Sequence, residues 1–387
     1  FAIYLLLPAA ISATYGRNSW LITLLGVIIY GLTFLAIVAG WRYPDRRTGV
    51  EFFMLGYAVM AALMLAGGPL EAFGLQERFP MIGTERLGHI WVTYRTGTAV
   101  HMLAGFFRSP DVMGWHASLV FMVAVIMAFR SRGAGRWLWI GVAAWGVLNI
   151  WLCGRRKMLS MIPIFTGAYL LLVLRFSTFR RIVSVAATAL MIGGLGWYII
   201  TTLYHDEAVE RFYLTTIEEA EVRVQQHGIR AVISTVRQAG FWGYGLGMSQ
   251  QGVHNLKVEK PHLWQEGGAG KLVAELGIPG AVLYLLLWYE LLMTAYHVIR
   301  LARRDENFFF TAGIASILVA NLSAAVVSAQ IFGDPLVALL LAFLIGLLFS
   351  AARGQAPPGA AGPAPATELV PRPAAMVDSK AEGAGTA

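Results

Sequence analysis

The side chains of this chain that are best suited to chemistry are arginines and a lysine in two places. Residues 154 to 157 read Gly-Arg-Arg-Lys and form a short basic turn between two apolar segments. Further along, Arg223, Arg230 and Arg237 recur every seven residues, which puts them near one stripe of a helix. An arginine donates two parallel hydrogen bonds to a phosphate and stays charged at any relevant pH. These positions predict a site for an anionic, phosphate-bearing ligand, with a solvated helix face as the alternative for the stripe.

Groups that could take up a proton gather just ahead of a long apolar segment. Residues 252 to 280 hold several titratable side chains, and the candidates for a general base are His254, His262 and Glu266. A surface or capping role is the alternative for any single histidine. The chain has no His-Glu-x-x-His pattern and no paired outer carboxylates at metal spacing, so we expect neither a metal nor another cofactor. Cations alone could then stabilise a diphosphate leaving group.

A glycine run follows the polar, helix-like stretch of residues 201 to 240. It reads Gly243-Tyr244-Gly245-Leu246-Gly247. Closely spaced glycines can aim backbone amides at an anion, and they can equally make a tight turn. The run does not match a dinucleotide-binding loop, because no strand precedes it. Both interpretations, an amide nest and a turn, are kept for this segment.

The elements that must position these residues are membrane-spanning helices. Of the 387 residues 57% are hydrophobic and 13% charged, and apolar runs near the roughly 20 residues needed to cross a bilayer recur along the chain. The runs are continuous rather than alternating, which argues against an outer-membrane barrel. We predict an all-α polytopic membrane protein of about ten transmembrane helices with a partly helical periplasmic loop domain. The predicted spans are residues 2–14, 19–39, 50–67, 114–129, 137–152, 158–174, 182–200, 272–296, 308–330 and 334–351.

Basic residues set the predicted orientation. Four loops each carry three arginines: Arg42, Arg46 and Arg47; Arg130, Arg132 and Arg136; Arg175, Arg180 and Arg181; Arg300, Arg303 and Arg304. The positive-inside rule assigns these loops to the cytoplasm. Alternate crossing then puts Arg155, Arg156 and Lys157 on the outer side, where an anionic substrate explains them better than topology does. Topology also accounts for much of the net charge of +8, so we expect no nucleic-acid partner.

We expect four regions along the chain. Residues 1–200 form a first transmembrane group, 201–271 a periplasmic loop domain, 272–352 a last transmembrane group and 353–387 a disordered cytoplasmic tail rich in Ala, Pro and Gly. The single Cys153 allows no internal disulfide. The chain begins at Phe1 inside an apolar run, so we expect further sequence upstream.

The order of these elements resembles the bacterial O-antigen ligase and polymerase family over residues 114–300. The resemblance rests on the turn Cys153-Gly154-Arg155-Arg156, on Arg230 ahead of the Gly-x-Gly-x-Gly run, on His254-Asn255, and on Glu275-Leu276-Gly277-Ile278-Pro279-Gly280. It implies an integral inner-membrane glycosyltransferase, metal-independent, that moves a glycan from an undecaprenyl-diphosphate-linked donor to an acceptor hydroxyl at the periplasmic face. Surface polysaccharide assembly, of O-antigen or exopolysaccharide, would be its setting. Expected partners are the donor, a glycan or lipid-core acceptor, membrane lipids, and a chain-length regulator or flippase of the same pathway.

The chain departs from the family in the spacing of the base. Family members usually have the His-Asn pair closer to the glutamate of the Glu-x-Gly-x-x-Gly block than here, where 21 residues separate His254 from Glu275 and nine separate Glu266 from it. The base is therefore His254, displaced by an insertion, or Glu266 in its place, with His262 between them. No second nucleophile is placed for a covalent intermediate, which favours a single inverting displacement. Ligation and polymerisation both fit these residues.

Two other functions compete with this interpretation. A peptidoglycan polymerase of the shape, elongation, division and sporulation family uses similar donors, but its outer catalytic aspartate is hard to place, since Asp111 and Asp206 lack a supporting motif. A transporter or flippase of an anionic lipid-linked substrate predicts charges inside several spans. Within the predicted spans the charges are chiefly Glu275 and Glu290, both in one helix.

Overall fold

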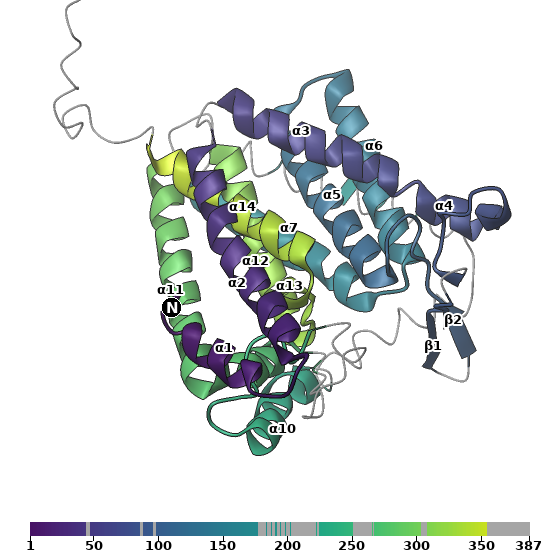
Figure 1. Ribbon diagram of the computed structural model, residues 1–387. Coiled ribbons are helices and arrows are strands. Elements are labelled where there is room, and N and C mark those ends of the chain that lie inside the picture. Colours follow the sequence, from purple (N-terminus) through teal and green to yellow (C-terminus); the bar gives the residue numbers. More distant parts are fainter. Residues whose placement is uncertain are drawn as a thin grey trace, which may run out of the picture.

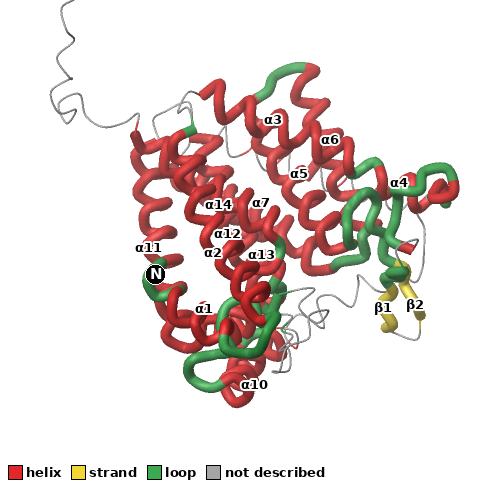
Figure 2. Tube along the Cα trace, in the orientation of Figure 1, coloured by secondary structure: helices red, strands yellow, loops and turns green. Residues whose placement is uncertain are grey.

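The computed structural model describes residues 1–43, 47–85, 88–95, 98–176, 224–250, 267–302 and 308–353, together with a few single positions between them. It is almost entirely helical (Figures 1 and 2), so the predicted all-α class is confirmed. The long helices are α2 (Ser19–Arg42), α3 (Arg47–Met64), α5 (Pro110–Arg130), α6 (Ala134–Leu152), α7 (Arg156–Phe176), α11 (Gly268–Ala302), α12 (Phe308–Val327) and α14 (Pro335–Arg353). The short ones are α1 (Leu6–Ala13), α4 (Gly67–Ala72), the 3-10 turn η1 (Leu75–Glu77), α10 (Ile229–Ala239) and α13 (Gln330–Gly333).

Helix α5 is the core of one half of the bundle. It is buried along nearly its whole length and packs against α3, α6, α7 and α12. A second group lies beside it, in which α14 packs along α2 and α11 stands at the edge (Figure 1). Burial on all sides explains why α5 is apolar around its circumference rather than on one stripe. It can therefore hold the residues at its ends in fixed positions.

Six helical segments of the described chain are long and apolar enough to cross a membrane, which indicates a membrane-embedded, multi-pass protein. They are 19–42, 49–72, 110–130, 156–176, 268–302 and 308–327. Helices α6 and α14 occupy two further predicted spans. The span predicted at 2–14 is instead the eight-residue α1, which is only about 12 Å long. The span predicted at 182–200 lies mostly outside the described residues, as does the tail from residue 354 onward.

The described arginines that begin the four arginine loops lie at one end of the bundle, which we call the basic end. Its described members include Arg42, Arg130, Arg175 and Arg300, each in the last turn of its helix. Arg130 pairs with Glu51 at the start of α3 (3.0 Å) and lies over the ring of Phe310 at the start of α12. Pro110, at the other end of α5, is roughly 30 Å away. We call that end the opposite end.

A β-hairpin interrupts the helical pattern and was not predicted. Strands β1 (Val92–Arg95) and β2 (Thr98–His101) pair antiparallel within residues 68–113. Both strands contain β-branched residues and a two-residue Thr-Gly link joins them, which is a local hairpin signal. Glu71 organises the same region, because its buried carboxylate accepts hydrogen bonds from the amides of Ala104 (2.8 Å) and Gly105 (2.6 Å).

Candidate functional site

Two local signals bring the first functional residues together at the opposite end. Helix α5 begins with Ser109 as N-cap, whose Oγ accepts from the amide of Val112, and with Pro110 in its first turn. Asp111 therefore sits in the first turn, where a negative charge is favourable. Between α6 and α7 the chain turns at Gly154, whose φ of 65° is the left-handed region that favours glycine. That turn places the start of α7 beside the start of α5.

Asp111 joins two of the predicted outer cations. Its Oδ2 lies 2.8 Å from Nη2 of Arg155 and its Oδ1 lies 2.7 Å from Nζ of Lys157. The two cationic side chains are about a quarter exposed, and the Arg155 guanidinium lies 5.8 Å from the ring centre of Trp91. Arg156, the third predicted cation, is buried and does not share this surface. The opposite end therefore presents Arg155 and Lys157 as one fixed pair.

Arg108 extends this pair toward the second helix group. Its Nη2 lies 2.6 Å from Oδ2 of Asp334, and half of its side chain is exposed. Asp334 is held in turn by the first turn of α14, because its Oδ1 accepts from the amides of Leu336 (2.9 Å) and Val337 (3.2 Å). We call Arg108, Arg155 and Lys157 the cation row. Arg108 was missing from the predicted site, although it stands only three residues before Asp111.

The glycine run is a close-packed turn. The amide of Leu246 donates to the carbonyl of Pro8 in α1 (3.1 Å) and the amide of Tyr244 to the carbonyl of Ala274 in α11 (2.6 Å). A Cβ at Gly247 would lie 2.2 Å from the carbonyl oxygen of Ile22. The loop thus packs between α1, α2 and α11, and its glycines allow its backbone to approach the backbones of these helices closely. This arrangement favours the turn interpretation over an anion-binding nest.

Helix α11 is broken where the loop meets it. Gly277 has a non-helical φ of 70°, so the helical hydrogen bond from Ile278 N–H to Ala274 O is lost, and Pro279 has no N–H to donate to the carbonyl of Glu275. Both groups find partners in the loop, since Ile278 N–H donates to Phe241 O (2.9 Å) and Ala274 O accepts from Tyr244 N–H. The Glu-x-Gly-x-x-Gly block and the Gly-x-Gly-x-Gly run therefore form a single packed unit.

A buried polar cluster lies on the N-terminal side of the break in α11. We call it the Lys271 cluster, and its members are Tyr30, Ser249, Gln250, Lys271 and Glu275. Glu275 Oε1 lies 3.3 Å from Lys271 Nζ and accepts from the amide of Ser249 (3.2 Å), while its Oε2 accepts from the hydroxyl of Tyr30 (2.9 Å). Lys271 Nζ donates to the carbonyl of Ser249 (3.1 Å). Both charged side chains are at most 1% exposed. Their i,i+4 spacing was visible in the sequence, but their burial was not.

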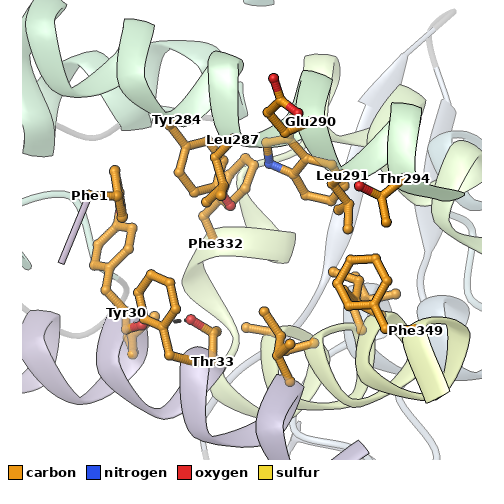
Figure 3. Close-up of a pocket in the computed structure, with 18 residues that line it drawn as sticks. Phe1, Tyr30, Thr33, Tyr284, Leu287, Glu290, Leu291, Thr294, Phe332 and Phe349 are labelled. Carbon is orange, nitrogen blue, oxygen red and sulfur yellow. Dashed lines mark hydrogen bonds between the residues drawn. The ribbon is translucent and has the colours of Figure 1, made fainter. Parts of the chain in front are cut away.

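An apolar groove of about 250 Å³ adjoins this cluster. It lies between α2, α11 and α14, with Tyr30 and Thr33 facing Tyr284, Leu287 and Leu291 (Figure 3). Along α14 the lining runs from Ala338 to Phe349, which is roughly 16 Å of helix. Tyr30 belongs to both the groove and the Lys271 cluster. Phe332, another lining residue, stands two residues before Asp334, so one end of the groove lies near the partner of Arg108.

The predicted arginine stripe falls on α10. Arg230 and Arg237 are both exposed, while Ala231 and Thr235 form the buried face of this helix, which packs against α11. Arg223 lies outside the residues whose side chains the structure describes. The stripe is thus solvent-facing at its two described positions, and neither position belongs to the cation row.

The three candidate bases, His254, His262 and Glu266, all lie outside the described residues. The described chain ends at Gln250 on one side and resumes at Gln265 and Gly267 on the other. Both sides meet the Lys271 cluster, because the amide of Lys271 donates to the carbonyl of Gly267 (3.1 Å) while its Nζ binds Ser249.

No protein-family model matches this chain, and no curated protein matches it either. The resemblance to O-antigen ligases and polymerases therefore rests on the motifs alone. What the geometry adds is that two of these motifs form one unit and that the basic turn faces a carboxylate. The arrangement sets three cations at the opposite end and an apolar groove between α2, α11 and α14.

Proposed function

We propose that the protein is an inner-membrane glycosyltransferase that transfers or polymerises glycan from an undecaprenyl-diphosphate-linked donor. The observation that carries the proposal is the cation row beside an apolar groove. A lipid diphosphate has one end of each kind, a polyanionic head and an apolar chain. Arg108, Arg155 and Lys157 suit the head, and the groove between α2, α11 and α14 suits the chain. The resemblance to ligases and polymerases points to the same donor.

The orientation follows from the two ends of the bundle. The basic end holds the arginine loops and is assigned to the cytoplasm by the positive-inside rule. The cation row at the opposite end then faces the periplasm. Arginine in or near hydrocarbon costs on the order of 2.5 to 3.5 kcal/mol on insertion scales. The positive charges of the cation row are therefore better explained by an anionic ligand than by the positive-inside rule.

The proposed reaction is one inverting displacement. The acceptor hydroxyl oxygen attacks the anomeric carbon, a new glycosidic bond forms, and the bond to the diphosphate breaks, so that the diphosphate leaves with the electron pair. The hydroxyl proton passes to a base, for which His254, His262 and Glu266 remain the candidates. Arg108 and Arg155 stabilise the charge that develops on the leaving group through paired hydrogen bonds, and Lys157 through its point charge.

Asp111 has a positioning role in this scheme. A free arginine or lysine side chain samples many rotamers, and ordering it costs up to about 2 kcal/mol of entropy. Asp111 holds both side chains before the donor arrives, because each of its oxygens contacts one cation. The carboxylate thereby lowers the ordering cost of donor binding, while it also opposes the anion electrostatically.

The rivals explain less of the geometry. A peptidoglycan polymerase would need an available outer aspartate, whereas both oxygens of Asp111 are engaged by cations. A transporter of an anionic substrate would need a polar path across the membrane. The groove is mainly apolar, and the charges of the Lys271 cluster are paired with each other and buried. The glycosyltransferase uses both the groove and the cation row.

The test is transfer by the purified protein in nanodiscs with undecaprenyl-diphosphate oligosaccharide as donor. Ladders of longer glycan indicate polymerisation, and one added glycan on a lipid A core indicates ligation. Arg155→Lys should lower turnover by at least about tenfold, because lysine keeps the charge but loses the two-pronged geometry. Arg130→Lys, at the basic end, is the matched control and should stay near normal. No transfer to either acceptor by wild-type protein that binds the donor would reject the proposal.

A further inference from the structure

Buried charges deep in a membrane protein are costly and rarely lie there without a role. Lys271 and Glu275 contact neither the cation row nor the groove surface directly. Their described partners are the backbone of Ser249, which ends the glycine loop, and the hydroxyl of Tyr30 in α2. The pair therefore joins a helix of the groove to the outer loop.

Tyr30 is the residue that makes this connection. Its ring lines the groove, so a chain lying there would contact it, and its hydroxyl donates to Glu275 Oε2 at 2.9 Å. The other oxygen of Glu275 holds the amide of Ser249. Because one carboxylate binds both groups, a shift of the tyrosine changes the position of the loop end.

The loop end has a second link to the groove. Gln250 donates from Nε2 to the carbonyl of Phe332 (3.3 Å), and Phe332 also lines the groove. Ser249 and Gln250 are both nearly fully buried. These hydrogen bonds connect Ser249 to α2, through Glu275 and Tyr30, and Gln250 to α13, through Phe332. A chain in the groove would therefore contact Tyr30 on one side of the loop end and Phe332 on the other.

We propose that Tyr30, Glu275 and Lys271 form a positioning unit through which a lipid chain in the groove fixes the end of the glycine loop. This inference rests on the proposed function in taking an isoprenoid chain as the occupant of the groove. A chain in the groove holds Tyr30 and Phe332 in place, which keeps the Ser249–Gln250 end in its buried position and slows its opening. Donor binding and the position of the Ser249–Gln250 end are then coupled.

The substitution Ser249→Cys introduces a thiol whose reactivity reports whether the loop end is open. The cluster uses the amide and carbonyl of Ser249, which this substitution retains. The native Cys153 gives no background, because it is fully buried and burial raises the pKa of its thiol to about 12. The rate of N-ethylmaleimide modification in nanodiscs, with undecaprenyl phosphate or with phosphatidylglycerol at the same fraction, then reports opening of the loop end.

We expect undecaprenyl phosphate to slow modification of the Ser249→Cys protein by about fivefold or more, the usual lower range for coupled sites. Tyr30→Phe, added to this reporter, keeps the ring but loses the hydroxyl, and it should abolish the protection. Tyr57→Phe is the matched control, since Tyr57 also has a polar partner, His116 (2.9 Å), but does not line the groove. It should leave the protection intact.

A photoactivatable undecaprenyl phosphate separates the two proposals. Cross-links to α2 and α11 without any change in the modification rate of the reporter would overturn the coupling and leave the donor site standing. Equal protection of the reporter with and without Tyr30→Phe would also overturn the coupling. Absence of cross-links to both helices would reject the groove as the lipid site, and the positioning unit with it.

Discussion

Replacement of Asp111 by asparagine tests the cation row most sharply, because two opposite effects are expected. The carboxylate holds Arg155 at 2.8 Å and Lys157 at 2.7 Å, so its loss should destabilise the fold. The same carboxylate repels an anionic ligand, whereas asparagine keeps the size of the side chain and one acceptor oxygen for positioning the cations, so the substitution should also tighten binding of pyrophosphate. A purely structural ion-pair cluster would show only the first effect.

The size of each effect follows from the geometry. Breaking a buried ion pair costs about 3 to 5 kcal/mol, and an exposed one below about 1 kcal/mol. Arg155 and Lys157 are 25% and 24% exposed, so a loss in unfolding free energy of roughly 1 to 3 kcal/mol is expected. A unit charge about 6 Å from a doubly charged phosphate contributes about 1.4 kcal/mol at the dielectric constant of water. That is roughly a tenfold gain in affinity.

Calorimetric titration of purified protein with inorganic pyrophosphate, together with thermal unfolding, measures both quantities. Glu51→Gln is the matched control, because it removes an ion pair of similar length, 3.0 Å to Arg130, at the basic end. It should lower stability slightly and leave pyrophosphate binding unchanged. A folded Asp111→Asn protein that binds pyrophosphate no more tightly than wild type would refute the assignment of these cations to a phosphate.

Four further outcomes are expected. Lys157→Cys should react with a membrane-impermeant maleimide in intact spheroplasts, with Cys153 silent, and reaction only after the inner face is opened would reverse the orientation. Gly277→Ala should lower thermal stability by about 2 kcal/mol or more through its left-handed φ and a contact of 2.5 Å with loop backbone, whereas Gly141→Ala, with open space around it, should not. Arg230→Lys should leave transfer near normal, because Arg230 is exposed and lies outside the cation row, and a severe loss at normal protein levels would assign this arginine to the donor site. Alanine at the true base should cost about two to four orders of magnitude in turnover in the presence of chelator, so a tenth or more of normal turnover in all three variants would remove the candidates His254, His262 and Glu266.

Local signals in the sequence predicted much of the helical scaffold. Residues 110–130 and 308–327 were predicted closely because their apolar runs are continuous and bounded by polar caps. The run at 2–14 failed because composition alone does not show where a helix begins, and α1 covers only eight residues of it. The hairpin at 92–101 was not predicted because the continuous apolar runs along the chain indicated helices alone.

Long-range contacts decided the parts of the site that the sequence left open. Asp111 was set aside as an aspartate without a motif, since its partners Arg155 and Lys157 lie 44 and 46 residues further along. The choice between a turn and an amide nest depended on carbonyls of Pro8 and Ala274 that no local pattern identifies. Spacing can predict a helix face, but it cannot predict which distant group meets that face.

The packing of the two glycine motifs changes what the family resemblance implies. A signature of glycines and a buried glutamate need not mark reacting atoms, because here Gly277 and Gly243 allow two backbones to meet and Glu275 holds a loop end. Such residues would be shared by any protein that packs this loop against a broken helix, whatever its activity. On the proposed function, residues that distinguish ligation from polymerisation are to be sought outside this packed scaffold, beginning with the cation row. Substitutions in the scaffold should lower stability and activity together, whereas substitutions in the cation row should separate them.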